Sequence, residues 1–213
     1  EIIVTAEHRP VDIAEVATSV TVLTGDTIDA RSAQHLEDLM RTIPNLNAAS
    51  GASRNRFFQI RGIGERSQYQ EPINPSVGLI VDGVDFSGLG LSATTLDIDQ
   101  VEVLRGPQGT LHGASALAGL ISLRSSQPTD TAFTELSGTL GNYGDRRVSF
   151  IDSRPLSSEL AYRFAISTTQ HNGYIKNTFL QRSDTNNIDE NTIRGRLRWS
   201  AGDHTTDIGL FNF

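Results

Sequence analysis

The chain has 213 residues, 37% of them hydrophobic, and carries 25 acidic against 18 basic side chains, a formal net charge of -7 at pH 7. This acidic balance argues against nucleic-acid binding, which needs clustered Lys and Arg against phosphates. The absence of cysteine excludes disulfides and thiolate metal sites. The sequence contains no apolar run of the roughly 18 residues that a transmembrane helix requires.

The first half of the chain, to about residue 125, mixes short helices with short strands. An alternating strand is predicted at 19–23, followed by a short helix capped by Thr24. Apolar residues at every third or fourth position from Leu36 to Ile43 predict a second helix, which Pro44 ends because proline lacks a backbone donor. Further short strands, each bounded by Gly, Pro or Ser, are predicted at 57–62, 77–84, 100–106 and 119–125.

From Thr134 onward the chain is a series of alternating strands without helical periodicity. In the last but one of them, Ile193, Leu197 and Trp199 alternate with arginines. Such strands suit a barrel wall with lipid on one side and water on the other. A soluble antiparallel sheet with one wet face is the alternative that this pattern leaves open. The strands are predicted at 134–142, 146–154, 159–169, 191–200 and 205–213, with a long polar connection after the third.

Two glycine-rich segments resemble nucleotide or catalytic motifs without completing them. "GLGLSA" (88–93) fits a dinucleotide fingerprint, but the next predicted strand follows too soon for the required helix. "RGPQGTLHGASALAG" (105–119) lacks the lysine of a phosphate loop and the G-x-S-x-G order of a nucleophile elbow. The histidines show no metal-ligand spacing, and no nucleophile, base and orienting group come together. We therefore expect no enzyme activity, no catalytic or metal-binding residue and no cofactor.

Seven segments in chain order carry a strong resemblance to a known family: "EIIVTA", "SVTVLTGDTI", "HLEDLMRTIPNL", "FFQIRGIG", "NPSVGLIVDGV", "QVEVLRGPQGTLHG" and "AGLISLRSSQP". Together they make residues 1–128 similar to the plug domain of TonB-dependent outer-membrane receptors, and the strands from 134 resemble the first strands of the receptor barrel. The resemblance implies an α+β plug domain followed by antiparallel β-strands of an incomplete transmembrane β-barrel.

The implied organisation has three parts: a TonB box and N-terminal extension at 1–10, the plug domain at 11–128, and the first strands of the barrel, about five, at 129–213. A plugged transporter has about 22 strands, and five cannot close around a plug. We therefore expect the chain to be the N-terminal part of a longer receptor. The family's place is the outer membrane of a Gram-negative bacterium, with the strands against outer-membrane lipid and the plug accessible from the periplasm.

The N-terminal segment is short, extended and β-branched, as a segment that pairs with a partner by strand addition needs to be. The resemblance assigns it to the TonB box, which pairs with TonB, the periplasmic arm of the inner-membrane energising complex. The residues so assigned are Ile2, Ile3, Val4, Thr5 and Ala6. An ordinary edge strand of the plug is the alternative interpretation.

The resemblance also implies two further sets of site residues. In the family, the arginines of the I-R-G and L-R-G-P motifs pair with glutamates of the barrel wall, and these arginines correspond here to Arg61 and Arg105. A ligand site is implied on outward-facing loops at 48–55, 65–73 and 85–92, where arginine suits anionic or chelate groups and apolar side chains give broad contact. The predicted ligand-binding residues are Arg54, Arg66, Gln68, Tyr69, Phe86 and Leu89.

The function implied by the resemblance is energy-coupled import of a scarce nutrient, a ferric siderophore in most members. The small-molecule substrate is then a ferric chelate. The same fold importing carbohydrate, cobalamin or another nutrient is one alternative. A periplasmic binding or signalling domain formed by the plug alone is another.

Overall fold

The computed structural model describes residues 2–5, 10–48, 54–67 and 69–212. It divides into two compact units, Glu1–Ser125 and Ser126–Phe213. The division falls where mixed helices and strands give way to strands alone. None of the described helices is long and apolar enough to cross a membrane.

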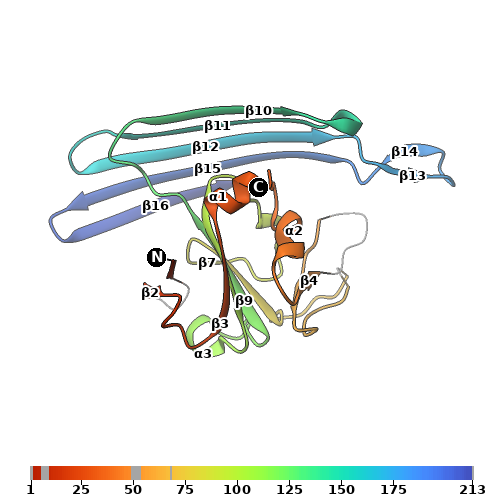
Figure 1. The fold of residues 1–213 in the computed structure, drawn as a ribbon, viewed down its shortest axis with the longest axis horizontal. Helices are drawn as coiled ribbons and strands as arrows, with labels where there is room; N and C mark the ends of the chain where they lie inside the picture. Colours follow the sequence, from red (N-terminus) through yellow and green to blue (C-terminus); the bar gives the residue numbers. More distant parts are fainter. Residues whose placement is uncertain (1, 6–9, 49–53, 68, 213) are drawn as a thin grey trace. The chain divides into compact units, whose positions relative to one another are not determined.

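The first unit is built on a five-stranded sheet with the order β3-β8-β9-β6-β7. Three of its strands, β3, β9 and β7, are labelled in Figure 1. Neighbouring strands are antiparallel, except that β6 and β9 run parallel. The predicted strands at 19–23, 100–106 and 119–125 are confirmed. The sheet strands are β3 (Ser19–Thr24), β8 (Ile98–Arg105), β9 (Gly119–Ser125), β6 (Val77–Val81) and β7 (Val84–Asp85).

The core of the first unit lies on β8 and β9, two adjacent inner strands of this sheet. Leu104 of β8 and Leu120 of β9 are cross-strand partners and are buried, and Val20 and Ile80 pack against them. Strand β8 is buried along almost its whole length, although it also carries polar and charged side chains. Buried polar groups need hydrogen-bond partners, so β8 must recruit partners from other segments.

The helices of the first unit are short. Helix α1 (Gly25–Ala30) begins after Thr24 as predicted, but the Thr24 side chain makes no capping hydrogen bond to the backbone and instead lies 3.2 Å from the Thr27 hydroxyl. The second helix is shorter than predicted, because α2 (Leu36–Leu39) tightens into the 3₁₀ helix η1 (Met40–Thr42), and the Ile43 N–H donates to the Met40 carbonyl at 3.1 Å. Tightening of a last turn into 3₁₀ geometry is common at helix ends, and Pro44 prevents continuation. The other short helices are η2 (Gly90–Ser92) and α3 (Gly109–His112).

The strand predicted at 77–84 is a hairpin, which corrects the sequence prediction. Asp82 and Gly83 both have positive φ, 48° and 83°, as the central residues of a type I′ turn do, and this turn separates β6 from β7. The Asp82 carboxylate accepts hydrogen bonds from the backbone N–H of Ser125 at 2.8 Å and from its hydroxyl at 2.7 Å. The turn thereby fixes the last residue of β9.

A second strand pair joins β4 (Leu46–Ala48) to β5 (Phe58–Ile60) in antiparallel register. The strand predicted at 57–62 is confirmed in its middle, but it ends at Ile60 because the next two residues turn. Arg61 and Gly62 have φ values of 53° and 79°. The turn directs Arg61 away from the strand and leaves its side chain exposed.

The second unit is a five-stranded antiparallel sheet with the order β10-β11-β12-β15-β16 (Figure 1). The five predicted strands are confirmed, and β12 and β15 are longer than predicted. Within the long polar connection the structure adds a small hairpin, β13 (Ile175–Asn177) with β14 (Arg182–Thr185). A 3₁₀ turn, η3 (Asn142–Gly144), follows the first strand. The sheet strands are β10 (Phe133–Leu140), β11 (Arg146–Pro155), β12 (Leu160–His171), β15 (Ile188–Ala201) and β16 (His204–Asn212).

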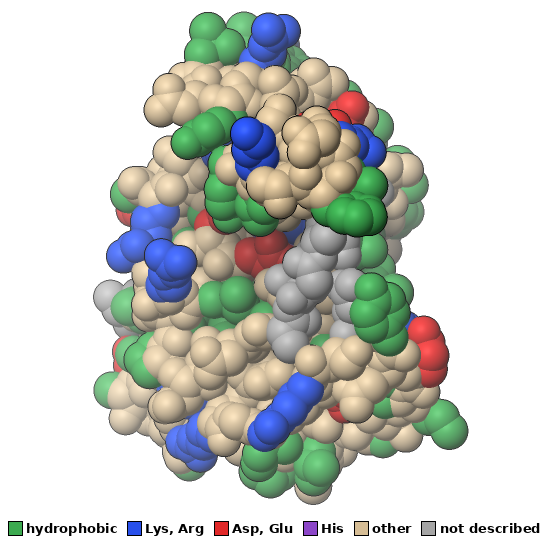
Figure 2. Space-filling model, turned by 90° about the vertical axis from the view of Figure 1, so that its right-hand side faces the viewer, with side chains coloured by type: hydrophobic (Ala, Val, Ile, Leu, Met, Phe, Trp, Pro, Cys, Tyr) green, Lys and Arg blue, Asp and Glu red, His purple; other side chains and the backbone are tan. Residues whose placement is uncertain are grey.

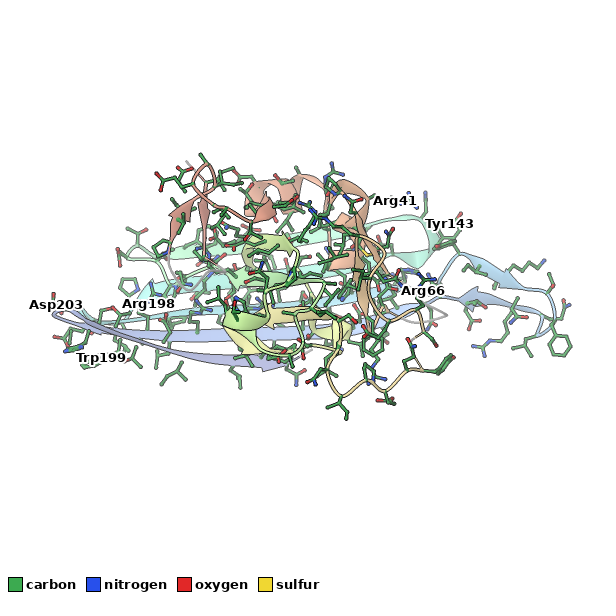
Figure 3. All side chains as sticks on the ribbon, turned by 90° about the horizontal axis from the view of Figure 1, so that it is seen from below. Arg41, Arg66, Tyr143, Arg198, Trp199 and Asp203 are labelled. Carbon is green, nitrogen blue, oxygen red and sulfur yellow. The ribbon has the colours of Figure 1, made fainter. Side chains whose placement is uncertain are left out.

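The strand register divides this sheet into an apolar face and an arginine-bearing face. Ile166 lies opposite Ile193, and Leu197 opposite Ile208, so large apolar residues form continuous rows across strands. Arg196 and Arg198 alternate with them and point to the other face. Along the strands, Trp199 lies near one end and Tyr143 at the other (Figure 3). The predicted alternation is therefore confirmed.

One polar cluster interrupts the apolar face close to the turn after Pro155. Asp152 accepts hydrogen bonds from Arg154 and from the hydroxyls of Thr134 and Tyr162. Each charge in the cluster has a partner on neighbouring strands.

Replacing two leucines of the first unit by alanine should have different effects on its free energy of unfolding, because one leucine is in the core and the other is exposed. Leu120→Ala should lower the free energy of unfolding of the first unit by about 2–5 kcal/mol, because it opens a cavity beside Leu104. The matched change Leu117→Ala should have almost no effect, since Leu117 is 64% exposed. Hydrogen exchange of the β8 and β9 amides measures both. Equal exchange in the two variants would contradict this account of the core.

Candidate functional site

The N-terminal segment is held as a strand of the first unit. Strand β1 (Ile3–Val4) pairs antiparallel with β2 (Val11–Asp12), and the Ile13 N–H donates to the Ile2 carbonyl at 2.9 Å. The Val4 side chain is fully buried, at 0% exposed. Of the residues assigned to partner binding, Ile2, Ile3, Val4 and Thr5 therefore lie in or beside this strand pair, and Ala6 lies outside the described residues.

Two side chains of β8 bind the same N-terminal segment. Gln100 Nε2 donates to the Ile3 carbonyl at 2.8 Å, and Glu102 Oε1 accepts from both the backbone N–H and the hydroxyl of Thr5, each at 2.8 Å. Gln100 Nε2 also donates to Glu102 Oε1 at 2.8 Å. Glu102 is only 1% exposed, so the N-terminal segment supplies hydrogen bonds that this buried carboxylate requires.

The second region of interest consists of the segments 54–57, 65–73 and 85–92, called here the apex loops. Arg56 connects all three. Its guanidinium forms a two-pronged ion pair with the Glu71 carboxylate at 2.8 and 2.9 Å, and its Nε donates to the Gly88 carbonyl at 3.1 Å. The same guanidinium lies over the Phe57 ring, 4.9 Å from the centroid. Arg56 thus fixes the arrangement of the loops that are predicted to carry the ligand.

The ion pair shifts both pKa values. Hydrogen bonds from Arg56 hold the pKa of Glu71 below its ordinary value of 4.5, and the hydrogen bond to Glu71 raises the pKa of Arg56. The pair is exposed, and exposed pairs contribute little to global stability. The effect of the Arg56–Glu71 pair is local, because Arg56 connects the loop at 65–73 to the other two apex loops.

A buried histidine supports the apex loops from beneath. His35 is fully buried, its Nδ1 accepts from the Glu37 N–H at 3.3 Å, and its Nε2 donates to the Gly90 carbonyl at 2.9 Å. The Glu37 carboxylate in turn accepts from Arg54 and from the backbone N–H of Asn55. A Cβ at Gly90 would lie 2.2 Å from the Asn55 carbonyl oxygen, so only glycine permits this close approach.

The predicted ligand-binding residues have different surroundings. Arg66, Tyr69 and Leu89 are exposed, and Arg66 projects from its loop (Figure 3). Phe86 is half-buried. Arg54 is mostly buried in its ion pair with Glu37 at 3.3 Å, which already neutralises its charge. Gln68 lies outside the described residues.

Two further apolar side chains of the apex loops are exposed. Ile73 and Leu91 are 96% and 56% exposed, and the sequence analysis did not name them. Hydrophobic side chains stand in small groups among Lys and Arg on the face shown in Figure 2. Among the described residues, no group of three or more His, Asp or Glu side chains is placed to hold a metal ion.

Arg61 and Arg105 lie around the same turn. Arg105 Nε donates to the Pro44 carbonyl at 3.0 Å, and the Arg61 N–H donates to the neighbouring Asn45 carbonyl at 3.0 Å. The Arg105 guanidinium also donates to the hydroxyls of Ser19 and Thr21. Burial, and then the positive charge of Arg61, lower the pKa of Arg105. The structure therefore brings together the two arginines that the sequence assigns to one lock.

Comparison with known proteins gives the family. The TonB-dependent Receptor Plug Domain family matches residues 12–120. The chain belongs to the TonB-dependent receptor family. It is 33% identical to the pesticin receptor of Yersinia pestis over 144 residues, which cover 68% of this chain and 21% of that protein. It is 22% identical to the vitamin B12 transporter BtuB of Vibrio vulnificus over 208 residues, 95% of this chain and 33% of that protein.

Solved structures agree with this placement. The ferric yersiniabactin uptake receptor FyuA from Yersinia pestis matches 90% of this chain and 30% of its own, with a TM-score of 0.78 and 27% identity. The chain thus spans between a fifth and a third of the length of these relatives. The predicted fold class, a plug followed by antiparallel strands of an incomplete barrel, is confirmed. The family consists of transport receptors of the Gram-negative outer membrane, which places this chain there.

The Arg56–Glu71 pair predicts a pH-dependent loop. A spin label on Tyr69→Cys, in a chain that has no other cysteine, reports the mobility of the loop at 65–73. Because the pKa of Glu71 is lowered, the pair is intact above pH 4.5 and is lost as pH falls through the lowered pKa. The label should therefore become mobile only in that acid range.

Arg56→Gln should make the same label mobile already at pH 7 and insensitive to acid. The matched control is Arg41→Gln, which changes an exposed arginine of η1 (Figure 3). Identical spectra for Arg56→Gln and the unsubstituted loop at pH 7 would show that Arg56 does not fix it.

Proposed function

We propose that this chain forms the plug and the first wall strands of a receptor that imports a ferric siderophore across the outer membrane by energy-coupled movement of the plug. The observation that carries the proposal is the similarity to the ferric yersiniabactin uptake receptor over 90% of this chain, at 27% identity. The apex loops support it. They expose the cationic Arg66 beside large apolar side chains such as Tyr69 and Leu89, a combination suited to an anionic, partly aromatic chelate.

The proposed mechanism uses two parts of the plug. Substrate binds the apex loops, including the predicted residues Arg66, Tyr69, Phe86 and Leu89. The N-terminal segment, Ile2–Ala6, pairs with TonB by strand addition, and force from the energising complex opens a path beside the plug. Each step of this mechanism is a binding event or a change in conformation of the plug. The mechanism therefore requires no covalent chemistry and no resident cofactor.

Arg61 and Arg105 have a different role in this proposal. The hydrogen-bond partners of the Arg105 guanidinium, from Pro44, Ser19 and Thr21, are neutral oxygens. Two adjacent guanidinium groups repel each other, and carboxylates from the barrel wall would relieve this repulsion. We expect these arginines to orient the plug in the closed receptor.

Two alternatives differ in cargo or in architecture. The likeness to the vitamin B12 transporter favours cobalamin as the second candidate cargo, with carbohydrate as a further one. A plug acting alone in the periplasm is less well supported, because the second unit presents a broad exposed apolar face that includes Leu136, Ile208 and Leu210. Such a face suits a lipid-facing wall.

Uptake assays test the cargo. Cells producing the receptor that contains this chain should accumulate iron from at least one class of ferric chelate, catecholate, hydroxamate or phenolate. Accumulation should require TonB and stop when a protonophore collapses the proton gradient. Accumulation of labelled cobalamin in place of iron would overturn the siderophore assignment.

Binding of the transported chelate to de-energised cells tests the apex loops. Arg66→Ala and Tyr69→Ala should each weaken binding by roughly tenfold, the effect of losing one important interface contact. The control, Arg31→Ala, removes an exposed arginine after α1 and should leave affinity unchanged. Unchanged affinity in both apex variants would remove these residues from the site.

A further inference from the structure

Both backbone edges of the N-terminal segment are occupied. In an antiparallel pair, the N–H and C=O groups of alternate residues point to opposite edges of the strand. The hydrogen bond from Ile13 to Ile2, together with the pairing of Val4 with Val11, directs the groups of Ile2 and Val4 toward β2. The groups of Ile3 and Thr5 therefore face the second edge.

At that second edge, two side chains of β8 take the place of a neighbouring strand. An added strand would offer a donor to the Ile3 carbonyl and an acceptor to the Thr5 N–H. Gln100 Nε2 provides the donor, and Glu102 Oε1 the acceptor, both at 2.8 Å. The two side chains lie two positions apart on one face of β8 and are hydrogen bonded to each other at 2.8 Å. They thereby reproduce the hydrogen-bonding pattern of a strand edge.

The same contacts couple the segment to the interior of the plug. Glu102 and Val4 are both almost inaccessible to solvent, at 1% and 0% exposed. Departure of the segment would expose Val4 and would remove from Glu102 the two hydrogen bonds that Thr5 donates. Exposing an apolar side chain and depriving a buried carboxylate of donors are both unfavourable, so the closed arrangement is favoured.

Strand addition requires an edge with unpaired N–H and C=O groups. We propose that Gln100 and Glu102 are positioning residues that act as a surrogate strand. They occupy the edge of Ile3–Thr5 and keep this segment from pairing with an incoming strand of TonB until it leaves β8. The assignment of the incoming strand to TonB rests on the proposed function. The closed state of the N-terminal segment does not depend on that assignment. Weakening the surrogate strand should increase the open fraction, and apparent affinity for the partner rises in proportion to that fraction.

A single cysteine measures the closed state directly. This chain has no cysteine, so in a receptor whose cysteines outside the chain have been replaced by serine, Val4→Cys gives one reactive thiol that is shielded while the segment is closed. In the full receptor in outer membranes, a water-soluble maleimide should label this thiol slowly. Adding Glu102→Ala or Gln100→Ala should accelerate labelling by about tenfold, the factor expected for losing a hydrogen bond to a charged or buried group.

Matched variants separate hydrogen bonding from general disruption. Glu102→Gln retains an acceptor oxygen for Thr5 and should label much more slowly than Glu102→Ala. Glu15→Ala removes an exposed glutamate close to β2 and should label at the unsubstituted rate. If Glu102→Ala fails to assemble, Thr5→Val, which removes only the hydroxyl donor, should still accelerate labelling several-fold. Unchanged labelling in the Gln100, Glu102 and Thr5 variants would overturn the surrogate strand.

Binding of the purified periplasmic domain of TonB, without substrate, distinguishes this inference from the proposed function. Faster labelling together with tighter TonB binding supports both. Faster labelling with no TonB binding in any variant supports the closed state and overturns the TonB assignment. Faster labelling accompanied by faster hydrogen exchange throughout β9 would mean that the whole plug has loosened, and would overturn the specific role of Gln100 and Glu102.

Discussion

A carboxylate buried on an inner strand of the plug sheet must be hydrogen bonded, and this constraint connects the N-terminal segment to that sheet. Glu102 lies on β8, which pairs with β3 on one side and β9 on the other. Two of its hydrogen bonds are donated by Thr5 of the N-terminal segment, almost a hundred positions away in the sequence, and another by Gln100 of the same strand. Farther along β8, Arg105 reaches Pro44 and the hydroxyls of β3. One strand therefore links the segment proposed to receive force with the arginines proposed to orient the plug.

The apex loops depend on a second set of polar contacts. Arg56 joins the three apex loops, and His35 supports them through Gly90. The hydrogen bond from His35 to Gly90 is buried, whereas the Arg56–Glu71 pair is exposed. The exposed pair is therefore the contact that solvent and pH affect first.

The periodicity of apolar residues predicted which side chains share a face of a strand, but it did not predict where helices and strands end. The alternation of Ile193, Leu197 and Trp199 with arginines predicted the faces of β15, because side chains on a strand change face at every residue. The helix after His35 was predicted too long, since apolar spacing does not reveal where an α-helix tightens into a 3₁₀ turn. The hairpin at Asp82–Gly83 was predicted as one strand, although Asp-Gly is a turn signal that was available.

The site could be predicted only in part, because its contacts join distant segments. The positions of the loops were predicted from the family resemblance. The contacts that hold the loops together were not, because Arg56 and His35 bind partners that are remote in sequence, such as Glu71 and Gly90. Arg54 was predicted to contact ligand because of its charge, and its ion pair with Glu37 could not be predicted because it depends on tertiary structure. The family motifs singled out Arg61 and Arg105 but did not predict that they lie around one turn, and the buried partners of the N-terminal segment had no local signal.

We propose that residues Ile2–Thr5 transmit energy for import and take no part in recognising the substrate. The most direct measurement compares binding and uptake of the same labelled ferric chelate by cells whose receptor lacks these four residues. Uptake should fall to the level of cells without TonB, while binding to de-energised cells should keep its affinity. Undiminished uptake by the shortened receptor would contradict the claim.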